Sequence, residues 1–356
     1  MYPRVIVNRK HVVHNVRTLK NLCAEHGIRI VGITKVFSGD PEIATCYIEG
    51  GLEMIGDSRV ENLKRLQDLS AEKWLIRPPM LSEVADLVAY ADASLNSELE
   101  VIRAISDEVV KKGISESHKV ILMADLGDIR EGYVDYDELV EVAKEVESLP
   151  GVYLYGVGVN LTCFSFITPD ESKMSDLALI RRRVEDAIGR KLDIVSGGNS
   201  GTLALMLEGG ICDGVDSLRL GESLLFGKER RHYSYLPDTY KDTFKLECEI
   251  VELKHKPSLP WGNIGADSYG VVPTFTDRGN DRVKAICALG KQDFDPEICT
   301  PLDPGIILLG ASSDHLMLDV TDSDRDYKVG DIIELELGYF SVMRAFTSKY
   351  VEKVYI

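Results

Sequence analysis

The chain has 356 residues, 44% of them hydrophobic, which is enough for one large domain and a smaller one. Its 41 lysines and arginines face 58 aspartates and glutamates, and the net charge of -17 disfavours nucleic acids and anionic membranes as partners. The sequence has no run of about 18 apolar residues, its start lacks the pattern of a signal peptide, and its seven cysteines are scattered without a C-x-x-C pair. We therefore expect a cytoplasmic protein with reduced thiols, no membrane span and no metal site.

Short apolar runs alternate with longer stretches of helical periodicity between about residues 30 and 227. A typical helical stretch is 97–112, where apolar residues recur at helical spacing. The predicted strands are 30–35, 53–57, 73–77, 93–96, 119–125, 152–160, 192–197 and 217–221. Strands that alternate with helices pair in parallel through right-handed crossovers. Eight such units predict a closed (β/α)8 TIM-type barrel, and an open doubly wound sheet is the alternative.

The pattern changes after residue 227. The stretch 228–242 is polar and aromatic and contains a proline, which is typical of a linker. From residue 244, apolar and polar residues alternate almost strictly, as in a half-buried strand. Further β-like runs follow at 283–289, 305–311, 315–320, 331–337 and 341–343.

These patterns predict two domains. We expect the barrel to occupy residues 8–232 and a smaller, antiparallel β domain to occupy residues 233–356. Residues 4–7 form a short apolar run that has no place in the barrel. We therefore expect the N-terminal segment 1–7 to join the β domain.

Lys35 is the first residue that suggests chemistry. It ends the first predicted strand, after the apolar run 30–33. The active site of such a barrel lies at the C-terminal ends of its strands. A lysine that is partly desolvated there can lose its proton and form a Schiff base with an aldehyde. The alternative is a solvated lysine at the end of a strand.

Two glycine-containing turns follow the seventh and eighth predicted strands. Asn199 and Ser200 lie in the first turn, which is expected to open a helix, and Gly221 and Glu222 lie in the second. Close backbone approach, helix N-terminal amides and the Ser200 hydroxyl suit a phosphate, and the loops after these two strands commonly form the phosphate site of a barrel. Together with Lys35 they predict a phosphorylated aldehyde on a lysine, which is the chemistry of pyridoxal 5'-phosphate.

At this point the chain resembles a known family, the fold-type III pyridoxal-phosphate enzymes, and within it the ornithine and lysine racemase branch related to alanine racemase. The resemblance spans nearly the whole chain and rests on the segments 31–40, 123–132, 156–160, 196–201, 218–227, 310–315 and 338–351. It implies an isomerase that interconverts the L and D forms of an amino acid, with a basic one such as ornithine or lysine as the expected substrate.

The resemblance also implies the residues that hold the cofactor. Lys35 would carry it as a Schiff base, while Ser200 and the backbone of Gly221 and Glu222 would hold its phosphate. The hydroxyl of Tyr339 is expected at the same phosphate. Asn199 lies in the same turn as Ser200 and is expected among the cofactor-binding residues.

Arg219 is expected to face the pyridine nitrogen. A permanent cation there keeps the nitrogen unprotonated and weakens the ring as an electron sink, which suits racemisation better than transamination. The alternative for Arg219 is a structural salt bridge within the barrel. Asn160 stands where alanine racemases place a histidine against the ring, and it is expected to bind the cofactor.

Racemisation removes a proton from one face of the α-carbon and returns one to the other face. By the resemblance, Lys35 serves one face. Lys291 stands where alanine racemase uses a tyrosine of the partner subunit, so Lys291 is the expected second proton carrier and Tyr269 the alternative. Arg130 resembles an arginine that steers the substrate carboxylate or the opposing base; a surface arginine is the alternative.

The stretch 312–315 places Ser313 and Asp314 beside His315. These are not a catalytic triad, because adjacent residues on a strand point to opposite faces. We expect the backbone near Ser313 to bind the substrate carboxylate and Asp314 to meet a distal ammonium. Gly39, at the position of another alanine-racemase tyrosine, leaves room for a longer side chain.

The resemblance further implies a homodimer with shared active sites. The alternative functions are a fold-type III decarboxylase, a non-catalytic pyridoxal-phosphate-binding protein and a Schiff-base aldolase. The cysteine-bearing run that such decarboxylases carry near the chain's end is not found, and the non-catalytic proteins resemble the barrel alone. An aldolase would leave the β domain unexplained.

Overall fold

The computed structural model describes residues 1–211, 213–266 and 270–356. They form two compact units, one of residues Arg9–Thr243 and one that combines Met1–Asn8 with Phe244–Ile356. The first unit ends at Thr243 and not at residue 232, because the chain after the last barrel strand stays bonded to the barrel. Leu236 N donates to Gly227 O over 2.7 Å, and Thr243 Oγ1 donates to Leu225 O.

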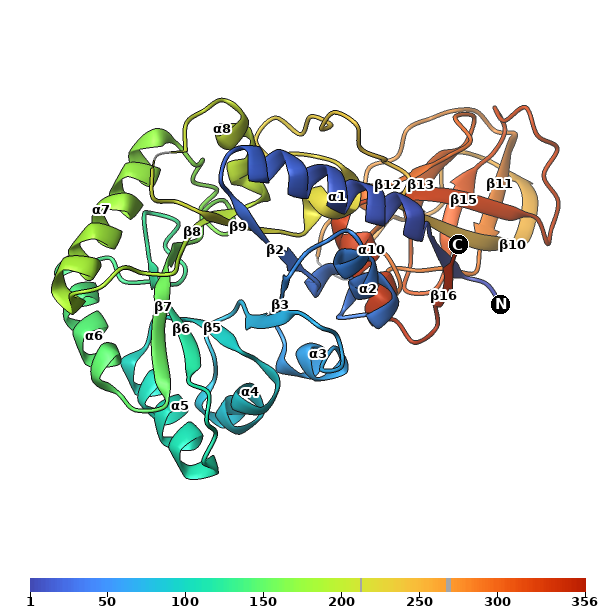
Figure 1. Ribbon diagram of the computed structural model, residues 1–356. Helices are drawn as coiled ribbons and strands as arrows, with labels where there is room; N and C mark the ends of the chain where they lie inside the picture. The colour runs from blue at the N-terminus through green and yellow to red at the C-terminus, as the bar shows by residue number, and fades with distance from the viewer. Residues whose placement is uncertain (212, 267–269) are drawn as a thin grey trace. The chain divides into compact units, whose positions relative to one another are not determined.

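The first unit is a closed barrel of eight parallel strands surrounded by helices (Figure 1). The strands are β2 Arg29–Ile33, β3 Met54–Asp57, β4 Glu72–Leu75, β5 Ala93–Asn96, β6 His118–Ala124, β7 Val152–Val159, β8 Ile194–Asn199 and β9 Ser217–Leu220. β9 pairs with β2, with Val31 beside Arg219, and so closes the ring. All eight predicted strands are present and the predicted barrel is confirmed, because buried apolar runs separated by turns specify such strands locally.

Helices cover the outside of the barrel (Figure 1). They are α1 Arg9–Glu25, α2 Pro41–Glu49, α3 Val60–Arg65, α4 Val84–Tyr90, α5 Leu99–Lys112, α6 Tyr136–Ser148, α7 Glu171–Ile188, α8 Leu203–Leu207 and α9 Glu222–Phe226. One apolar cluster fills the barrel, including Trp74 and Ile121, and a second lies between strands and helices. This double layer holds the strand ends, and therefore the site, in fixed positions.

The second unit is a mainly antiparallel sheet. Its strands are β1 Arg4–Val7, β10 Phe244–Lys256, β11 Arg282–Cys287, β12 Cys299–Pro301, β13 Ile307–Ala311, β14 Leu316–Asp319, β15 Ile332–Leu337 and β16 Glu352–Tyr355. The N-terminal strand β1 lies antiparallel to β10 and parallel to β16, so the expected pairing of the N-terminal segment is confirmed. The predicted strand at 341–343 is wrong: α10 Tyr339–Thr347 occupies this region and buries Val342, Ala345 and Phe346 at helical spacing.

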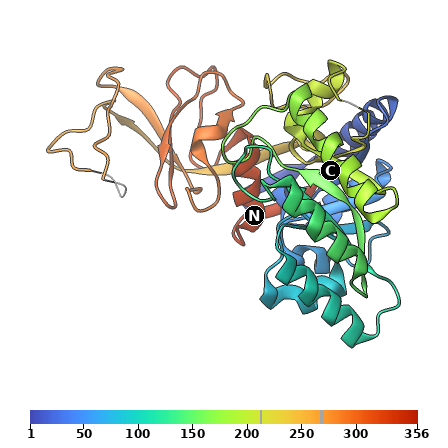
Figure 2. The same ribbon diagram turned by 90° about the vertical axis from the view of Figure 1, so that its left-hand side faces the viewer.

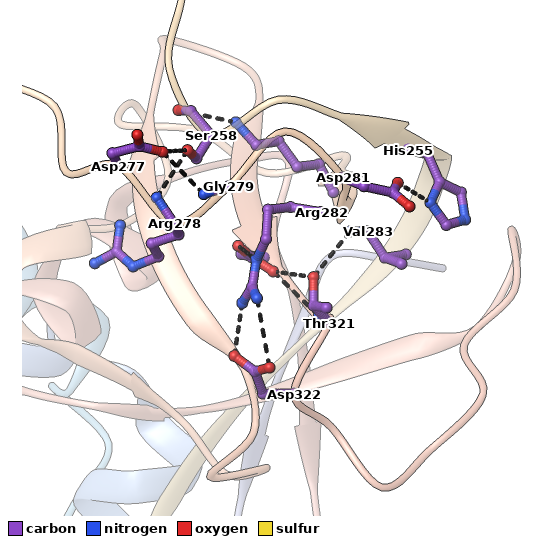
Figure 3. A network of polar contacts seen from close by, with 12 residues as sticks. His255, Ser258, Asp277, Arg278, Gly279, Asp281, Arg282, Val283, Thr321 and Asp322 are labelled. Carbon is purple, nitrogen blue, oxygen red and sulfur yellow. Dashed lines mark hydrogen bonds and ion pairs between the residues drawn. The ribbon is translucent and has the colours of Figure 1, made fainter.

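A polar network at one end of this sheet fixes the strand β11 (Figure 3). Arg282 Nε donates to the buried Asp319 over 2.8 Å, and its Nη2 donates to Asp322 over 2.6 Å. Ser258 and Asp277 bond to each other across the long connection between β10 and β11, which Figure 2 shows as a loop extending from the sheet. Charge-assisted hydrogen bonds of this kind hold the end of β11 against β14.

His118 is a buried histidine at the N-terminal end of β6, away from the strand ends that carry the site. Its Nε2 lies 2.8 Å from Ser94 Oγ, and the ring also bonds to the backbone of Ala91. Burial lowers the pKa of His118 from 6.5 to about 4, although the bond to Ala91 opposes the shift. The ring is therefore neutral in the folded protein near neutral pH.

This burial predicts an acid-sensitive fold. Between pH 6.5 and about 4 only the unfolded chain protonates His118, so the free energy of unfolding falls as the pH decreases through this window. The full shift corresponds to about 3 kcal/mol. We expect His118→Gln to flatten the pH dependence, measured by urea unfolding at several pH values in that window. Equal slopes in the two proteins would contradict the assignment.

Candidate active site

Lys35 lies just beyond the C-terminal end of β2. The strand ends at Ile33 rather than at Lys35, because Thr34 turns into the right-handed helical region and Lys35 begins a short 3-10 helix, Lys35–Phe37. The turn is closed by Ser38 N, which donates to Lys35 O over 3.1 Å. Lys35 is half-buried, as a residue at the mouth of a barrel is expected to be.

Asp57, which the sequence analysis missed, holds the residue before Lys35. It ends β3, is fully buried, and accepts hydrogen bonds from Thr34 Oγ1 over 2.6 Å and from Asn62 Nδ2 over 2.9 Å. Burial raises the pKa of Asp57, although these hydrogen bonds oppose the shift. An aspartate at the end of an apolar strand run was the signal that pointed to it.

Arg219 lies inside the barrel on β9, between β2 and β8. Its Nη1 donates to Ser196 Oγ over 2.6 Å and its Nη2 donates to Val159 O over 2.8 Å. Both acceptors are uncharged, and within residues 1–211, 213–266 and 270–356 no carboxylate lies at ion-pair distance, so the alternative of a structural salt bridge is not observed. Burial lowers the pKa of Arg219 to about 10, which leaves the guanidinium charged at neutral pH.

Asn160 and Asn199 come together at the ends of β7 and β8. Asn199 Nδ2 donates to Leu161 O over 2.8 Å and to Asn160 Oδ1 over 3.3 Å. Asn160 is buried, and its Nδ2 has no hydrogen-bond partner in the described part of the chain. Cys163, an exposed thiol that the sequence analysis did not single out, lies 3.4 Å from Asn199 Nδ2. A buried donor without a protein acceptor is typical of a group that awaits a ligand.

The two glycine-containing turns meet at Ser200 and Ser223. The strand β8 continues to Asn199, beyond the predicted end at residue 197, with irregular pairing to β9, and Gly198 adopts φ 114°, a conformation that favours glycine. Ser223 N donates to Ser200 Oγ over 3.4 Å, and the buried Ser223 Oγ has no partner among the described residues. Ser223 was not among the predicted site residues.

Gly221 and Glu222 begin the second of these turns. Gly221 caps α9, and Glu222 is its first residue. Burial raises the pKa of Glu222, while Arg230, 4.0 Å from its carboxylate, opposes the shift. Because α8 and α9 have five residues each, amides and hydroxyls rather than a helix dipole make these turns attractive to an anion.

Arg130 lies in the loop after β6 and forms an ion pair with the next residue. Its Nε and Nη2 both donate to the carboxylate of Glu131. Burial lowers the pKa of Arg130, but the bonds to Glu131 outweigh burial and raise the pKa above its ordinary value. Burial lowers the pKa of Arg219, and the Glu131 carboxylate opposes this shift.

The β unit brings three of its predicted site residues together, Lys291, Ser313 and Asp314. Lys291 N donates to Ser312 O over 2.8 Å, and Gly290 lies so close to Ser313 O that a Cβ there would be 1.9 Å away. Ser313 Oγ donates to Asp314 Oδ2 over 2.8 Å. The loop with Lys291 and the loop with Ser313 and Asp314 therefore form one surface of this unit.

Tyr339 lies within the described part of the chain, unlike Tyr269, the alternative proton carrier. Tyr339 begins α10, is half-buried and stacks edge-on against Phe340. In the same helix, Arg344 Nη1 donates to Lys291 O over 3.1 Å, which links α10 to the Lys291 loop. Tyr269 lies outside the described residues.

Neither a membrane-spanning helix nor a cluster of metal ligands is found among the described residues. No helix there is both long and apolar enough to cross a membrane. The described histidines, cysteines, aspartates and glutamates include no group of three that could hold a metal ion.

The chain is similar to proteins of one family. Residues 7–229 match the family model for the alanine racemase N-terminal domain. The chain is 41% identical to ornithine racemase of Acetoanaerobium sticklandii, with 99% of each chain covered. It is 37% identical to lysine racemase of Thermotoga maritima, with 100% of this chain and 99% of the relative covered. Its fold matches the crystal structure of alanine racemase from Bartonella henselae with covalently bound pyridoxal phosphate (TM-score 0.73, 17% identity, 99% of each chain).

Proposed function

Since the chain belongs to the alanine racemase N-terminal domain family, we propose that it is a pyridoxal-phosphate-dependent isomerase that racemises a basic amino acid. The observation that supports this most directly is its full-length similarity to an ornithine racemase and a lysine racemase, at 41% and 37% identity. The substrates in both names are amino acids with a distal amine. The similarity to alanine racemase structures, at 17% identity, concerns the fold alone.

The barrel unit suits pyridoxal phosphate in three ways. Asn160 Nδ2 and Ser223 Oγ are buried polar atoms without partners in the described residues, and Arg219 is a buried cation with uncharged acceptors. These groups match a ligand with a phosphate and a weakly basic ring nitrogen. When bound, the cofactor supplies an aldehyde that condenses with amines and a ring that withdraws electrons from the substrate α-carbon.

We assign the cofactor contacts to residues near the barrel strand ends and to Tyr339 of the β unit. Lys35 Nζ forms the covalent attachment. The Ser200 hydroxyl and the backbone amides of Gly221 and Glu222 hold the phosphate, with the hydroxyl of Tyr339, and Asn160 and Asn199 line the site. Arg219 would donate a hydrogen bond to the pyridine nitrogen and would remain charged there, so the nitrogen would stay unprotonated.

The proton transfers are assigned to two lysines. Lys35 Nζ takes the α-proton on one face of the substrate, and Lys291 Nζ delivers a proton on the other face. Arg130 pairs with the substrate carboxylate as a charged donor. In the β unit, Asp314 accepts hydrogen bonds from Ser313 and from Gln292. A carboxylate has about four acceptor positions, so Asp314 retains capacity for a distal ammonium.

We also propose a homodimer with shared sites in the cytoplasm. Lys291, Ser313 and Asp314 belong to a different compact unit from Lys35, which agrees with a site that is completed by the β unit of a second copy. Six cysteines in the described chain are free thiols, as expected in a reducing compartment.

The function is tested by incubating the purified protein with cofactor and single L-amino acids, and by measuring the D enantiomer with chiral chromatography. We expect D-ornithine or D-lysine and little D-alanine, because Asp314 favours a side chain with a distal ammonium. D-alanine as the main product would contradict the substrate class. Release of carbon dioxide would identify a decarboxylase, and cofactor binding without turnover would identify a non-catalytic binding protein.

A further inference from the structure

The loop that carries Arg130 and Glu131 is closed at both of its ends. Asp125 Oδ1 accepts hydrogen bonds from Gly127 N over 2.8 Å and from Ile129 N over 3.1 Å. At the other end Tyr133 N donates to Met123 O over 2.9 Å, and Asp125 N donates to Tyr133 O over 3.0 Å. The loop therefore leaves β6 and returns to it, which fixes the path of the backbone between residues 125 and 133.

A second connection holds the same loop from the side. The buried carboxylate of Asp128 accepts hydrogen bonds from Phe164 N and Ser165 N, each over 3.1 Å, in the chain segment after β7. Ile129 follows with φ 54°, a left-handed conformation that is unfavourable for a β-branched residue. Such a conformation persists only where the surroundings determine it, and here it directs the following residues, Arg130 and Glu131.

The Glu131 side chain is buried, and its carboxylate forms an ion pair with the more exposed Arg130. Its side chain is 9% exposed, whereas that of Arg130 is 41% exposed, and two nitrogens of Arg130 donate to its carboxylate. A buried carboxylate is costly unless a cation compensates it, so the ion pair ties the Arg130 guanidinium to the Glu131 carboxylate although Arg130 is partly exposed.

Arg219 is the second cation that this carboxylate influences. The pKa of Arg219 is lowered chiefly by burial, raised by the Glu131 carboxylate and lowered by the Arg130 guanidinium. The attraction of the Glu131 carboxylate therefore offsets part of the cost of burying Arg219. Neither of the two residues that accept hydrogen bonds from Arg219 is charged, so this compensation does not come from its direct partners.

We propose that Glu131 is a positioning residue of the site, the carboxylate that holds Arg130 in place. The inference rests on the proposed function for its catalytic meaning: Arg130 is useful to a substrate carboxylate only if it is held at a fixed place. It goes beyond the proposed function because Glu131 acts through Arg130.

The test compares Glu131→Gln, which removes the charge at nearly constant size, with Glu131→Asp, which keeps the charge. The control is Glu185→Gln, because Glu185 is also buried, at 3% exposure, and pairs with Arg181 and Lys191. Glu185 bonds to Leu192 N before β8 begins, so it lies at the opposite end of the strands. It therefore reports the general cost of losing a buried carboxylate.

Two readouts are taken on the full-length protein. The first is the rate at which phenylglyoxal modifies Arg130, mapped by mass spectrometry, and it requires no turnover. We expect Glu131→Gln to raise this rate several-fold, and Glu131→Asp and Glu185→Gln to leave it near that of wild type. The second is steady-state racemisation of ornithine or lysine, for which Glu131→Gln should reduce kcat/KM by about tenfold or more, with Glu131→Asp recovering most of the loss.

The outcomes separate this inference from the proposed function. The positioning role would be overturned if Arg130 in Glu131→Gln were modified at the wild-type rate. It would also be overturned if Glu185→Gln raised the rate as much as Glu131→Gln does. If none of the proteins racemises an amino acid but modification of Arg130 follows the expected order, the proposed function fails while the hold of Glu131 on Arg130 stands. If Glu131→Gln does not fold, the Glu131→Asp variant provides the test. Modification of Arg130 in Glu131→Asp as fast as in a denatured control would overturn the proposal.

Discussion

Lys35→Ala is expected to reduce racemisation by about four orders of magnitude or more, because it removes both the covalent attachment and one of the two proton carriers. The phosphate and ring contacts of the other strand ends are unchanged, so the variant should still bind free cofactor. The measurement is the rate of D-enantiomer formation, together with borohydride reduction of the wild-type protein and peptide mapping of the reduced cofactor. The mapped label should lie on Lys35.

Lys73→Ala is a suitable control, because Lys73 is also a half-buried lysine of a barrel strand. Its Nζ donates to Leu69 O over 2.8 Å and to Ala71 O over 3.0 Å, near the start of β4 and away from the strand ends of the site. This variant should keep its activity. A cofactor label on any lysine other than Lys35 would contradict the central assignment.

Lys35→Ala also tests whether two copies share a site. We expect Lys291→Ala to be strongly impaired, because it removes the second proton carrier. If the β unit of one copy serves the barrel of the other, mixing Lys35→Ala with Lys291→Ala should restore part of the activity once subunits exchange. No recovery in samples that contain mixed dimers would mean that each site is built within one chain.

Arg219→Glu is expected to slow racemisation by roughly a hundredfold and to increase transamination of the cofactor. A carboxylate at this place stabilises a protonated pyridine nitrogen. The ring then withdraws electrons more strongly, which favours side reactions such as transamination. The measurements are the rate of racemisation and the amount of pyridoxamine phosphate formed per turnover.

A structural cost accompanies the change at Arg219. The new carboxylate would face Val159 O, which accepts from Arg219 in the wild type and offers no proton. Leaving a buried charge without its partner costs about 3–5 kcal/mol, so the variant should also unfold more easily. Arg219→Lys is the matched control, because it keeps the positive charge and should show little transamination.

Three results distinguish the possible roles of Arg219. Slow racemisation with more transamination supports its place at the pyridine nitrogen. Complete loss of cofactor binding in Arg219→Glu, with normal binding in Arg219→Lys, would make it a structural residue of the barrel. Racemisation at the wild-type rate would mean that Arg219 does not face the ring.

The sequence by itself determined the order of elements in the barrel. Runs such as 93–96 and 152–160 are apolar over the length of one buried strand, and the stretches between them repeat at helical spacing. These signals are local, and burial on both faces leaves little choice for such runs. For the same reason residues such as Lys35 and Asn160 could be assigned to the same end of the barrel from the sequence alone.

Local signals were insufficient where two structures suit the same residues. The stretch 341–343 has the short apolar pattern of a strand, yet α10 forms there because Val342, Ala345 and Phe346 all become buried on one face. The glycine-containing stretch 196–199 has the composition of a turn, yet pairing between Asn199 and Arg219 keeps it in β8. Neighbouring elements, which the local sequence does not contain, decide such cases.

Only the tertiary structure decided which polar side chains act together. Asp57 accepts from Thr34, 23 residues away, Asn199 donates to Asn160, 39 residues away, and Arg219 donates to Val159 O, 60 residues away. Hydrogen bonds and Coulomb interactions depend on distances of a few ångströms, and closure of the barrel sets those distances between residues far apart along the chain. The sequence determined which residues lie at the strand ends, and the closed barrel decided which of them are within reach of one another.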